Sequence, residues 1–220
     1  MHLFVKERLP NGRRHIYFCG IKIASYKRKR HTISQNSIVG QNNKISIPDG
    51  SKIKLSIYGD NNIVKVGKHK YSDNLYVRIG VPDCYCNNCT VIIGDDFNCN
   101  GATMLLLEDN TNVNIGNDCM FSDQIMMWCS DTHTMTDLNG KIINIGKEIK
   151  IGNHVWIGFG ATVLKNTRIP DNCVIGAGSL VAGKFDKPNC AIAGNPAKIV
   201  KENINWDRRR PKQYIKGSNK

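Results

Sequence analysis

The sequence predicts an all-β fold, a parallel β-helix of hexapeptide repeats, and three observations predict it. β-branched aliphatic residues recur every six positions in the second half of the 220-residue chain. A small or β-branched residue stands four places after most of them, and a turn former usually comes one place after. A period of six is neither the 3.6 of a helix nor the 2 of a flat strand, so we expect short strands stacked coil upon coil. The repeat positions are Ile145, Ile151, Ile157, Val163, Ile169, Ile175 and Val181.

The same phase is present upstream, where Ile115, Phe121 and Met127 are also six apart. Between 32 and 95 the repeat is ragged, with strand-like units such as NNIVKVG and VIIG at uneven spacing. We therefore expect one β-helix domain over residues 32–195. A proline and glycine segment ends it, and we expect residues 196–220 to be a basic tail.

Residues 128–144 interrupt the coils. The six-residue phase would put His133 and Asn139 at inward positions, and both are poor choices for a dry core. We therefore expect this segment to be a loop that protrudes from the solenoid. Loops on rigid scaffolds often carry binding and catalytic residues, so the loop is the first place to look for function.

The formal net charge of +13 is concentrated at the two ends of the chain. Residues 1–31 hold nine Lys or Arg against one acidic residue, and residues 184–220 hold ten against three. Segment 1–31 does not fit the repeat; we expect one short strand at 16–23, closed by the basic run 27–30. Such ends attract polyanions: nucleic acid, anionic lipid or acidic glycan.

Cysteine usage and hydropathy indicate a cytoplasmic protein. No run of eighteen apolar residues is present, and the first ten residues hold too short an apolar stretch for a signal peptide. Peripheral contact with the inner membrane or with a glycan-assembly enzyme stays open. Nine cysteines without a secretory signal favour reduced thiols. Cys84, Cys86, Cys89 and Cys99 could ligate zinc, but the usual second C-x-x-C pair is missing, so we expect small hydrophobic residues and no metal.

Two segments resemble a known family. IGNHVWIGFGATVLKNTRIPDNCVIGAGSLVAG followed by AGNPAK is similar to the last coils of bacterial hexapeptide-repeat acetyltransferases, and SDTHTM looks like the segment that carries their catalytic histidine. The resemblance is strong over 98–200 and generic over 32–97. Within the family it is greatest to O-acetyltransferases of capsular polysaccharide, including those that act on polysialic acid. Those enzymes pair a loop histidine with a tryptophan, here His133 and Trp156.

The resemblance implies a left-handed β-helix with three hexapeptides per coil, a homotrimer, and acetyl-CoA bound between two subunits. It implies His133 as the base, Trp156 as a residue that positions the acyl group or its oxyanion, and Asp131 as an orienting or acceptor-contacting carboxylate. Asn100 is a weaker match to an acceptor-contacting residue. The cofactor residues implied are Trp156, Gly160, Ala161, Ala177, Gly178, Ser179, Lys184, Pro196, Ala197 and Lys198.

Acetyl transfer to a hydroxyl needs a base, donors for the developing oxyanion, and both substrates held in line. A histidine accepts a proton near neutral pH, which suits His133. No cysteine lies in a nucleophile motif, so we expect direct attack by the acceptor without an acyl-enzyme. The acceptor expected from the basic ends and the resemblance is an anionic bacterial surface polysaccharide, not nucleic acid.

Three other functions fit the same fold. An N-acetyltransferase of a nucleotide-linked amino sugar or small xenobiotic would keep the cofactor and change the acceptor. A trimeric binding scaffold would use the basic ends and need no cofactor. A zinc carbonic anhydrase would need converging histidines, and the scatter of His69, His133 and His154 along the repeat argues against it.

Overall fold

The computed structural model describes residues 4–8, 13–18, 21–27, 37–69 and 73–218, with side chains for 37–69 and 73–216. The chain forms two compact units, Met1–Gln35 and Asn36–Lys220. The first unit holds an antiparallel sheet of β1 (Phe4–Arg8), β2 (Arg13–Phe18) and β3 (Ile21–Lys27). The single strand expected at 16–23 is therefore wrong, because the chain reverses between β2 and β3. Of the basic run expected at 27–30, Lys27 ends β3; residues 28–30 and the expected boundary after 31 lie outside the described residues.

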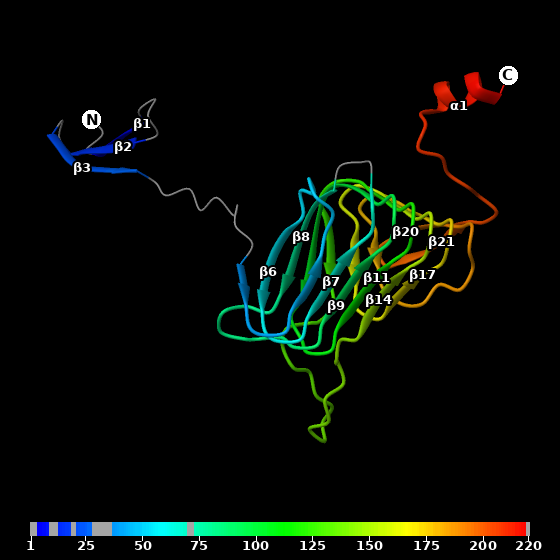
Figure 1. Cartoon of the computed structure of the whole chain (residues 1–220), viewed down its shortest axis with the longest axis horizontal. Helices are drawn as coiled ribbons and strands as arrows, with labels where there is room; N and C mark the ends of the chain where they lie inside the picture. The colour runs from blue at the N-terminus through cyan, green and yellow to red at the C-terminus, as the bar shows by residue number, and fades with distance from the viewer. Residues whose placement is uncertain (1–3, 9–12, 19–20, 28–36, 70–72, 219–220) are drawn as a thin grey trace. The chain divides into compact units, whose positions relative to one another are not determined.

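The second unit is a parallel β-helix with two sheets (Figure 1). The six-stranded sheet contains β5 (Lys44–Ser46), β7 (Ile63–Val66), β9 (Thr90–Ile93), β11 (Asn112–Ile115), β14 (Glu148–Ile151) and β17 (Thr167–Ile169). The twelve-stranded sheet contains β4 (Ser37–Val39), β6 (Lys54–Tyr58), β8 (Asp73–Ile79), β10 (Asn98–Leu106), β12 (Met120–Phe121), β13 (Ile125–Trp128), β15 (Trp156–Ile157), β16 (Thr162–Leu164), β18 (Val174–Ile175), β19 (Leu180–Val181), β20 (Ala191–Gly194) and β21 (Ala197–Lys201).

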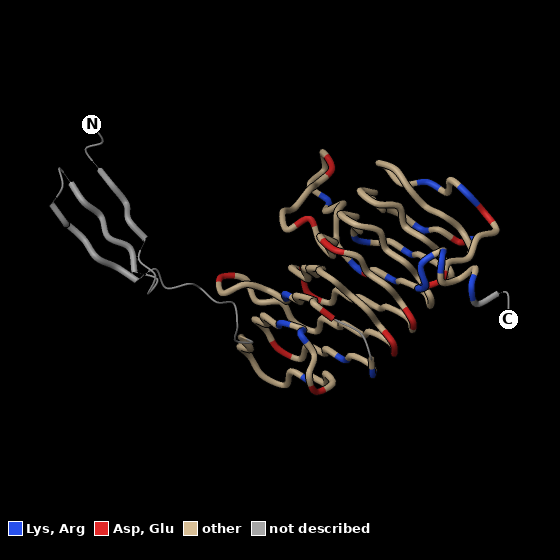
Figure 2. The backbone as a smooth tube through the Cα atoms, turned by 90° about the horizontal axis from the view of Figure 1, so that it is seen from above, with Lys and Arg blue, Asp and Glu red and all other residues tan. Residues whose placement is uncertain are grey.

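Strand register gives the size of a coil. In the last coils Trp156 pairs with Val174, Ile151 with Ile169 and Thr162 with Leu180, always eighteen residues on, or three hexapeptides. Across the predicted loop the same pairings are thirty-six residues apart, as between Met126 and Thr162. The loop therefore adds eighteen residues to one coil, which is why the six-residue phase survives it. Viewed from above, the coils follow one another as stacked rungs (Figure 2).

The core runs inside the coils. The predicted inward positions are buried to 2 % exposure or less: Ile151, Ile157, Val163, Ile169, Ile175 and Val181. Ile149, Val155 and Cys173, four places after repeat positions, are also fully buried. Ile145 is the exception, because it is 52 % exposed and belongs to the returning limb of the loop. The prediction that Ile145 is a core residue is therefore wrong, and the regular coils begin at β14.

Asparagine and aspartate side chains hold the corners of neighbouring coils together. At the corner that follows the six-stranded sheet, Asn117 Oδ1 accepts from Asp95 N, Asn153 Oδ1 from Asn117 N, and Asp171 Oδ1 from Asn153 N, all within 2.9 Å. The residue before each of these backbone donors must be small. A Cβ on Gly116, which precedes Asn117, would lie 2.6 Å from Asn153 Oδ1. The turn formers of the repeat thus make room for this hydrogen-bonded ladder.

The C-terminal segment folds against the last coils. The antiparallel hairpin of β20 and β21 spans the domain boundary that we expected at 195. After it, residues 202–210 run back to an earlier corner and lead into α1 (Pro211–Ser218). No helix in the described part of the chain is long and apolar enough to cross a membrane.

Candidate active site

The predicted loop is a hairpin-like arm, defined here as residues 129–147 (Figure 1). Its two limbs are joined by a hydrogen bond from Ile143 N to Met135 O at 3.0 Å and by an antiparallel β-bridge between Thr136 and Ile142. The chain reverses around Asp137, whose carboxylate accepts from the backbone of Lys141 at 2.9 Å. The arm leaves the corner between β13 and β14, so a rigid coil supports its root.

Asn144 and Lys165 brace the root of the arm. Asn144 Nδ2 donates to Asp131 Oδ2 at 2.9 Å and to His133 O at 2.8 Å, and its Oδ1 accepts from Met135 N at 2.8 Å. Lys165 Nζ, on the neighbouring coil, donates to Asp131 Oδ2 and to Asn144 O. The hydrogen bond from Lys165, and then that from Asn144, lowers the pKa of the Asp131 carboxyl. These contacts fix the backbone of His133 to the β-helix.

His133 opens onto a hollow of about 270 Å³ at this root. Its side chain is exposed, and its backbone N donates to Asp131 O at 2.7 Å across Thr132, which has a positive φ of 67°. Other arm residues, with Leu107 and Glu108 of the preceding coil, form the rest of the wall. The described contacts of the Asp131 carboxylate are with Lys165 and Asn144 rather than with the imidazole of His133, so Asp131 acts here as part of the brace.

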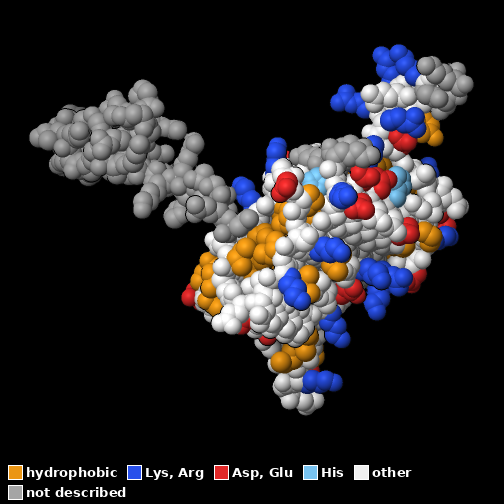
Figure 3. Space-filling model, viewed as in Figure 1, with side chains coloured by type: hydrophobic (Ala, Val, Ile, Leu, Met, Phe, Trp, Pro, Cys, Tyr) orange, Lys and Arg blue, Asp and Glu red, His pale blue; other side chains and the backbone are white. Residues whose placement is uncertain are grey.

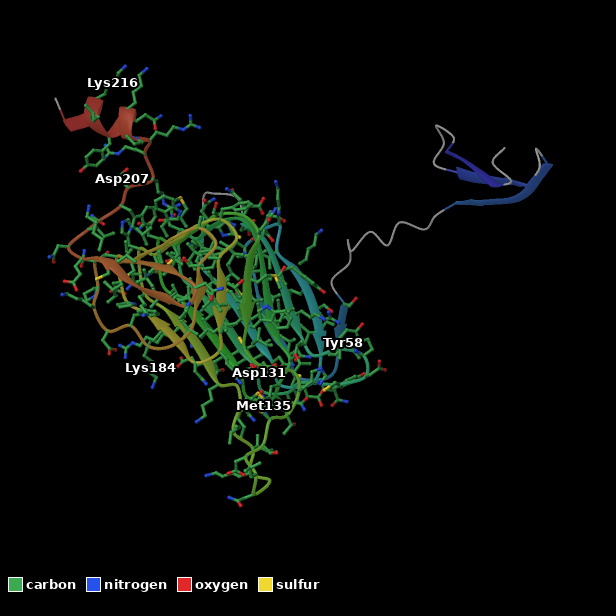
Figure 4. The ribbon with its side chains drawn as sticks, turned by 180° about the vertical axis from the view of Figure 1, so that it is seen from behind. Tyr58, Asp131, Met135, Lys184, Asp207 and Lys216 are labelled. Carbon is green, nitrogen blue, oxygen red and sulfur yellow. The ribbon has the colours of Figure 1, made fainter. Side chains whose placement is uncertain are left out.

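Trp156 lies at another corner of the coil. It begins β15, is 37 % exposed and is followed by the buried Ile157, as the repeat predicts. It lines a separate hollow of about 550 Å³ with Met120, Trp206 and Tyr214. Asp131 at the arm and Asp207 beside this second hollow lie on opposite sides of the coils (Figure 4). One chain therefore does not bring His133 and Trp156 into one hollow.

A strap of residues 202–210 closes the corner beside Trp156. The Trp206 ring stacks on His154, with centroids 4.2 Å apart, and its Nε1 donates to His154 O at 2.8 Å. Arg208 pairs with Asp118 at 2.9 Å. Burial alone would raise the pKa of the Asp118 carboxyl, but hydrogen bonds from His154 and Arg208 outweigh it and lower that pKa. The strap is thus an ordered part of the wall next to Trp156.

The expected cofactor residues fall into two places. Gly160 and Gly178, both with φ of 67°, stack at the corner between β15 and β16, since Gly178 N donates to Phe159 O at 2.8 Å. Ala161 and Ser179 are buried there, whereas Ala177 is exposed. Ser179 Oγ accepts from Gly194 N at 3.2 Å, which ties the hairpin holding Pro196, Ala197 and Lys198 to this corner.

Asn100 and Lys184 have different surroundings. Asn100 is exposed at the same corner as Gly160, two coils away, with its backbone N bonded to Ser122 O at 3.2 Å. Lys184 lies beside Arg168 at the edge of the six-stranded sheet, whereas Lys198 belongs to β21 of the twelve-stranded sheet. Lys184 and Lys198 therefore lie on different sheets of the same chain.

Most of the described cysteines are buried, whereas Cys84 is exposed. Burial raises the pKa of the Cys86, Cys99 and Cys129 thiols to about 12, so none of these three is a ready nucleophile or metal ligand. Within the described residues no group of three His, Cys, Asp or Glu could hold a metal ion. His69 pairs with Asp73 at 3.0 Å, and His154 with Asp118, away from the arm that carries His133.

Sequence reasoning missed the brace and the strap. Asn144 and Lys165 are ordinary polar residues in a loop and a turn, and the sequence gives no sign that they meet. Trp206 was a better candidate, because a tryptophan in a basic tail is unusual for a solvated segment and indicates a docking site on the fold.

Comparisons with known proteins identify the class. Residues 148–183 match the family described as bacterial transferase hexapeptide (six repeats). A polysialic acid O-acetyltransferase of Neisseria meningitidis is 36 % identical over 194 residues, which cover 77 % of this chain and 88 % of that protein. One of Escherichia coli O1:K1 is 37 % identical over 110 residues, 49 % of this chain and 35 % of that protein. This chain thus spans about a third of the second relative.

Two solved structures of polysialic acid O-acetyltransferases are also similar to this chain. The polysialic acid O-acetyltransferase OatWY superimposes with a TM-score of 0.63 and 35 % identity, over 80 % of this chain and 92 % of that one. The polySia-specific acetyltransferase NeuO gives 0.61 and 27 %, over 84 % and 97 %. The chain belongs to the hexapeptide-repeat acetyltransferases, and its β-helix is left-handed. It is an acetyltransferase related to the polysialic acid O-acetyltransferases.

Proposed function

We propose that this protein transfers an acetyl group from acetyl-CoA to hydroxyls of an anionic bacterial surface polysaccharide. The observation that carries the proposal is the similarity to polysialic acid O-acetyltransferases, which extends over 88 % of one such enzyme and includes the arm with His133. The acceptor named for those relatives is an acidic polymer, and the net charge of +13 on this chain suits such an acceptor.

His133 acts as the general base. Its imidazole takes the proton of the acceptor hydroxyl while the oxygen attacks the thioester carbonyl of acetyl-CoA. The C–O bond forms, negative charge collects on the carbonyl oxygen, and the C–S bond then breaks to release CoA as the thiol after it receives the proton from the imidazolium. The brace of Asn144 and Lys165 supports this role, because it holds the His133 backbone in one position while the side chain stays accessible.

A second copy of the chain completes the site. His133 and Trp156 line different hollows of one chain, so a trimer in which the arm of one copy reaches the Trp156 corner of the next would unite them. The Trp156 indole N–H then serves as a donor to the thioester or the oxyanion. The exposed ring of Trp156 also gains cover in such an assembly.

Acetyl-CoA lies along the corner of Gly160 and Gly178. Small residues there leave the backbone open to the pantetheine arm, and Ala161 and Ser179 contribute through backbone groups because their side chains are buried. The hairpin with Pro196, Ala197 and Lys198 is tied to this corner through Ser179 and offers a cation to the phosphates. Asn100 is an acceptor contact at the same corner.

Thiol release from acetyl-CoA tests the proposal, measured with polysialic acid, other acidic capsular polymers, neutral polysaccharides and amino sugars as acceptors. We expect turnover on an acidic polymer that falls at least about a hundredfold in His133→Ala. Turnover on an amino sugar instead would identify an N-acetyltransferase. Absence of turnover and of CoA binding would leave a binding scaffold.

A further inference from the structure

The six-stranded sheet carries a column of cations on its outer face. Strand register places Lys150 beside Arg168, and Arg168 beside Lys184, in three successive coils. All three side chains are exposed, whereas their neighbours Ile149, Ile151 and Ile169 point into the core. We name Lys150, Arg168 and Lys184 the basic column. Adjacent coils are about 4.8 Å apart, so the three charges follow the axis of the β-helix.

The basic column carries more positive charge than its described surroundings neutralise. Among the described contacts, none of its three side chains has an ion-pair partner. Glu148 lines the same hollow and accepts from Asn114 Nδ2 at 3.1 Å, and its single negative charge is outnumbered by the three cations of the column. Like charges directly opposite each other in neighbouring strands destabilise a sheet. An anion that binds along the column would remove this repulsion.

The column lines a hollow of about 680 Å³ that leads to the arm. Lys147 adds a fourth cation, and the returning limb of the arm contributes Ile142, Ile143 and Ile145. Ile142 and Ile145 also line the hollow of His133, so the two hollows share a wall. The face that holds β14 and β17 shows Lys and Arg side chains beside the hydrophobic root of the arm (Figure 3).

We propose that the basic column is a binding track for the acidic polysaccharide, which it guides toward His133. This inference deepens the proposed function and rests on it. A linear polymer with a carboxylate on each sugar can meet successive coils one charge at a time, while the isoleucines of the arm pack against the apolar faces of the sugar rings. The resemblance implied Lys184 as a phosphate contact of CoA. We assign it to this track instead, because it pairs with Arg168 and lines the same hollow.

The test is steady-state kinetics of the full-length chain with a double substitution, Lys150→Gln and Arg168→Gln. The KM for polysialic acid rises roughly tenfold, from the loss of two exposed ionic contacts. The KM for acetyl-CoA and the kcat at saturating polymer stay within about twofold, and the dependence of the polymer KM on salt becomes weaker. The matched control, Lys44→Gln with Lys65→Gln, removes two exposed lysines from the same sheet outside the hollow and leaves the polymer KM unchanged.

Two results would overturn the track. An unchanged polymer KM in the column variant shows that the polymer binds elsewhere. A rise in the KM for acetyl-CoA with no rise for the polymer shows that the hollow takes the phosphates of CoA. Direct binding of polysialic acid to the two double variants, measured by titration calorimetry without acetyl-CoA, tests the track even where no transfer occurs. Failure of the track is therefore distinct from failure of the proposed reaction.

Discussion

Asn144→Ala should loosen the arm without unfolding the β-helix. The side chain makes three hydrogen bonds, to Asp131, to His133 and from Met135. Each contributes about 1 kcal/mol when buried and less at this half-exposed position, so their loss costs about 2 kcal/mol of local stability. A local opening that is easier by about 2 kcal/mol raises amide exchange about thirtyfold.

The assay is hydrogen exchange at the Ile143 amide, which bonds to Met135 O between the two limbs of the arm. We expect this amide to exchange about thirtyfold faster in Asn144→Ala, while amides of β14 and β17 keep their protection. The Tm changes by less than about 3 °C, because the substitution lies outside the core. The kcat/KM for acetyl transfer falls at least about tenfold, since His133 loses its fixed backbone.

Asn139→Ala is the matched control. Asn139 lies in the same arm, and its side chain has no hydrogen-bond partner among the described residues, since only its backbone N bonds to Asp137. This variant should match wild type in exchange and in activity. If Asn144→Ala leaves both the Ile143 exchange rate and kcat/KM at wild-type values, the brace does not hold the arm and the reasoning is refuted.

Three further predictions concern the corner of the arm and the strap. Gly146→Ala places a Cβ 2.0 Å from the Cys129 carbonyl oxygen and should cost about 2 kcal/mol, read as a fall in Tm of about 4–8 °C. Trp206→Ala removes a ring that is 8 % exposed and its hydrogen bond to His154; it should cost the strap about 3 kcal/mol and speed tryptic cleavage within 208–210. The pKa of Asp131 is lowered, chiefly by the hydrogen bond from Lys165. The ionised carboxylate therefore supports the arm at neutral pH, and this support is lost as the pH falls below about 4. The loss should be measured as a lower protection factor of the Ile143 amide.

Each has a result that contradicts it. A Gly146→Ala protein with unchanged Tm means that the close backbone approach relaxes freely. Tryptic cleavage at an unchanged rate in Trp206→Ala means that the ring does not hold the strap; Trp128→Ala, on a different strand, is the comparison. For the pH effect, an Asp131→Asn variant should show the low protection at all pH values, and a wild-type arm equally protected at pH 7 and pH 3 contradicts the assignment.

The solenoid was predictable because its signal is local and repeated. Each coil places the same residue types at the same positions, so Ile151, Ile169 and their equivalents reveal the register without any knowledge of distant contacts. The arm was also predictable, since His133 and Asn139 occupy positions where the repeat requires apolar residues. The same reasoning was wrong for Ile145. This residue is aliphatic and stands six residues before Ile151, but it matches the six-residue repeat only because the arm adds eighteen residues, the length of a whole coil, before β14 begins.

The site was only partly predictable, because its contacts join residues far apart in the chain. Lys165 meets Asp131 from the next coil, and Arg208 reaches Asp118 across ninety residues. No periodicity records such pairs. The basic column needed the strand register as well, since Lys150, Arg168 and Lys184 are not equally spaced in the sequence and become neighbours only when the coils stack.

The central claim is that His133 of one copy works with Trp156 of another. Co-expression of His133→Ala with Trp156→Ala tests it most directly, by thiol release from acetyl-CoA with polysialic acid as acceptor. Each variant alone should be inactive. In randomly mixed trimers about a quarter of the sites receive an intact histidine from one copy and an intact tryptophan from the next, so activity should return to about a quarter of wild type. Activity no higher than that of the single variants would contradict the shared site and place both residues in one copy.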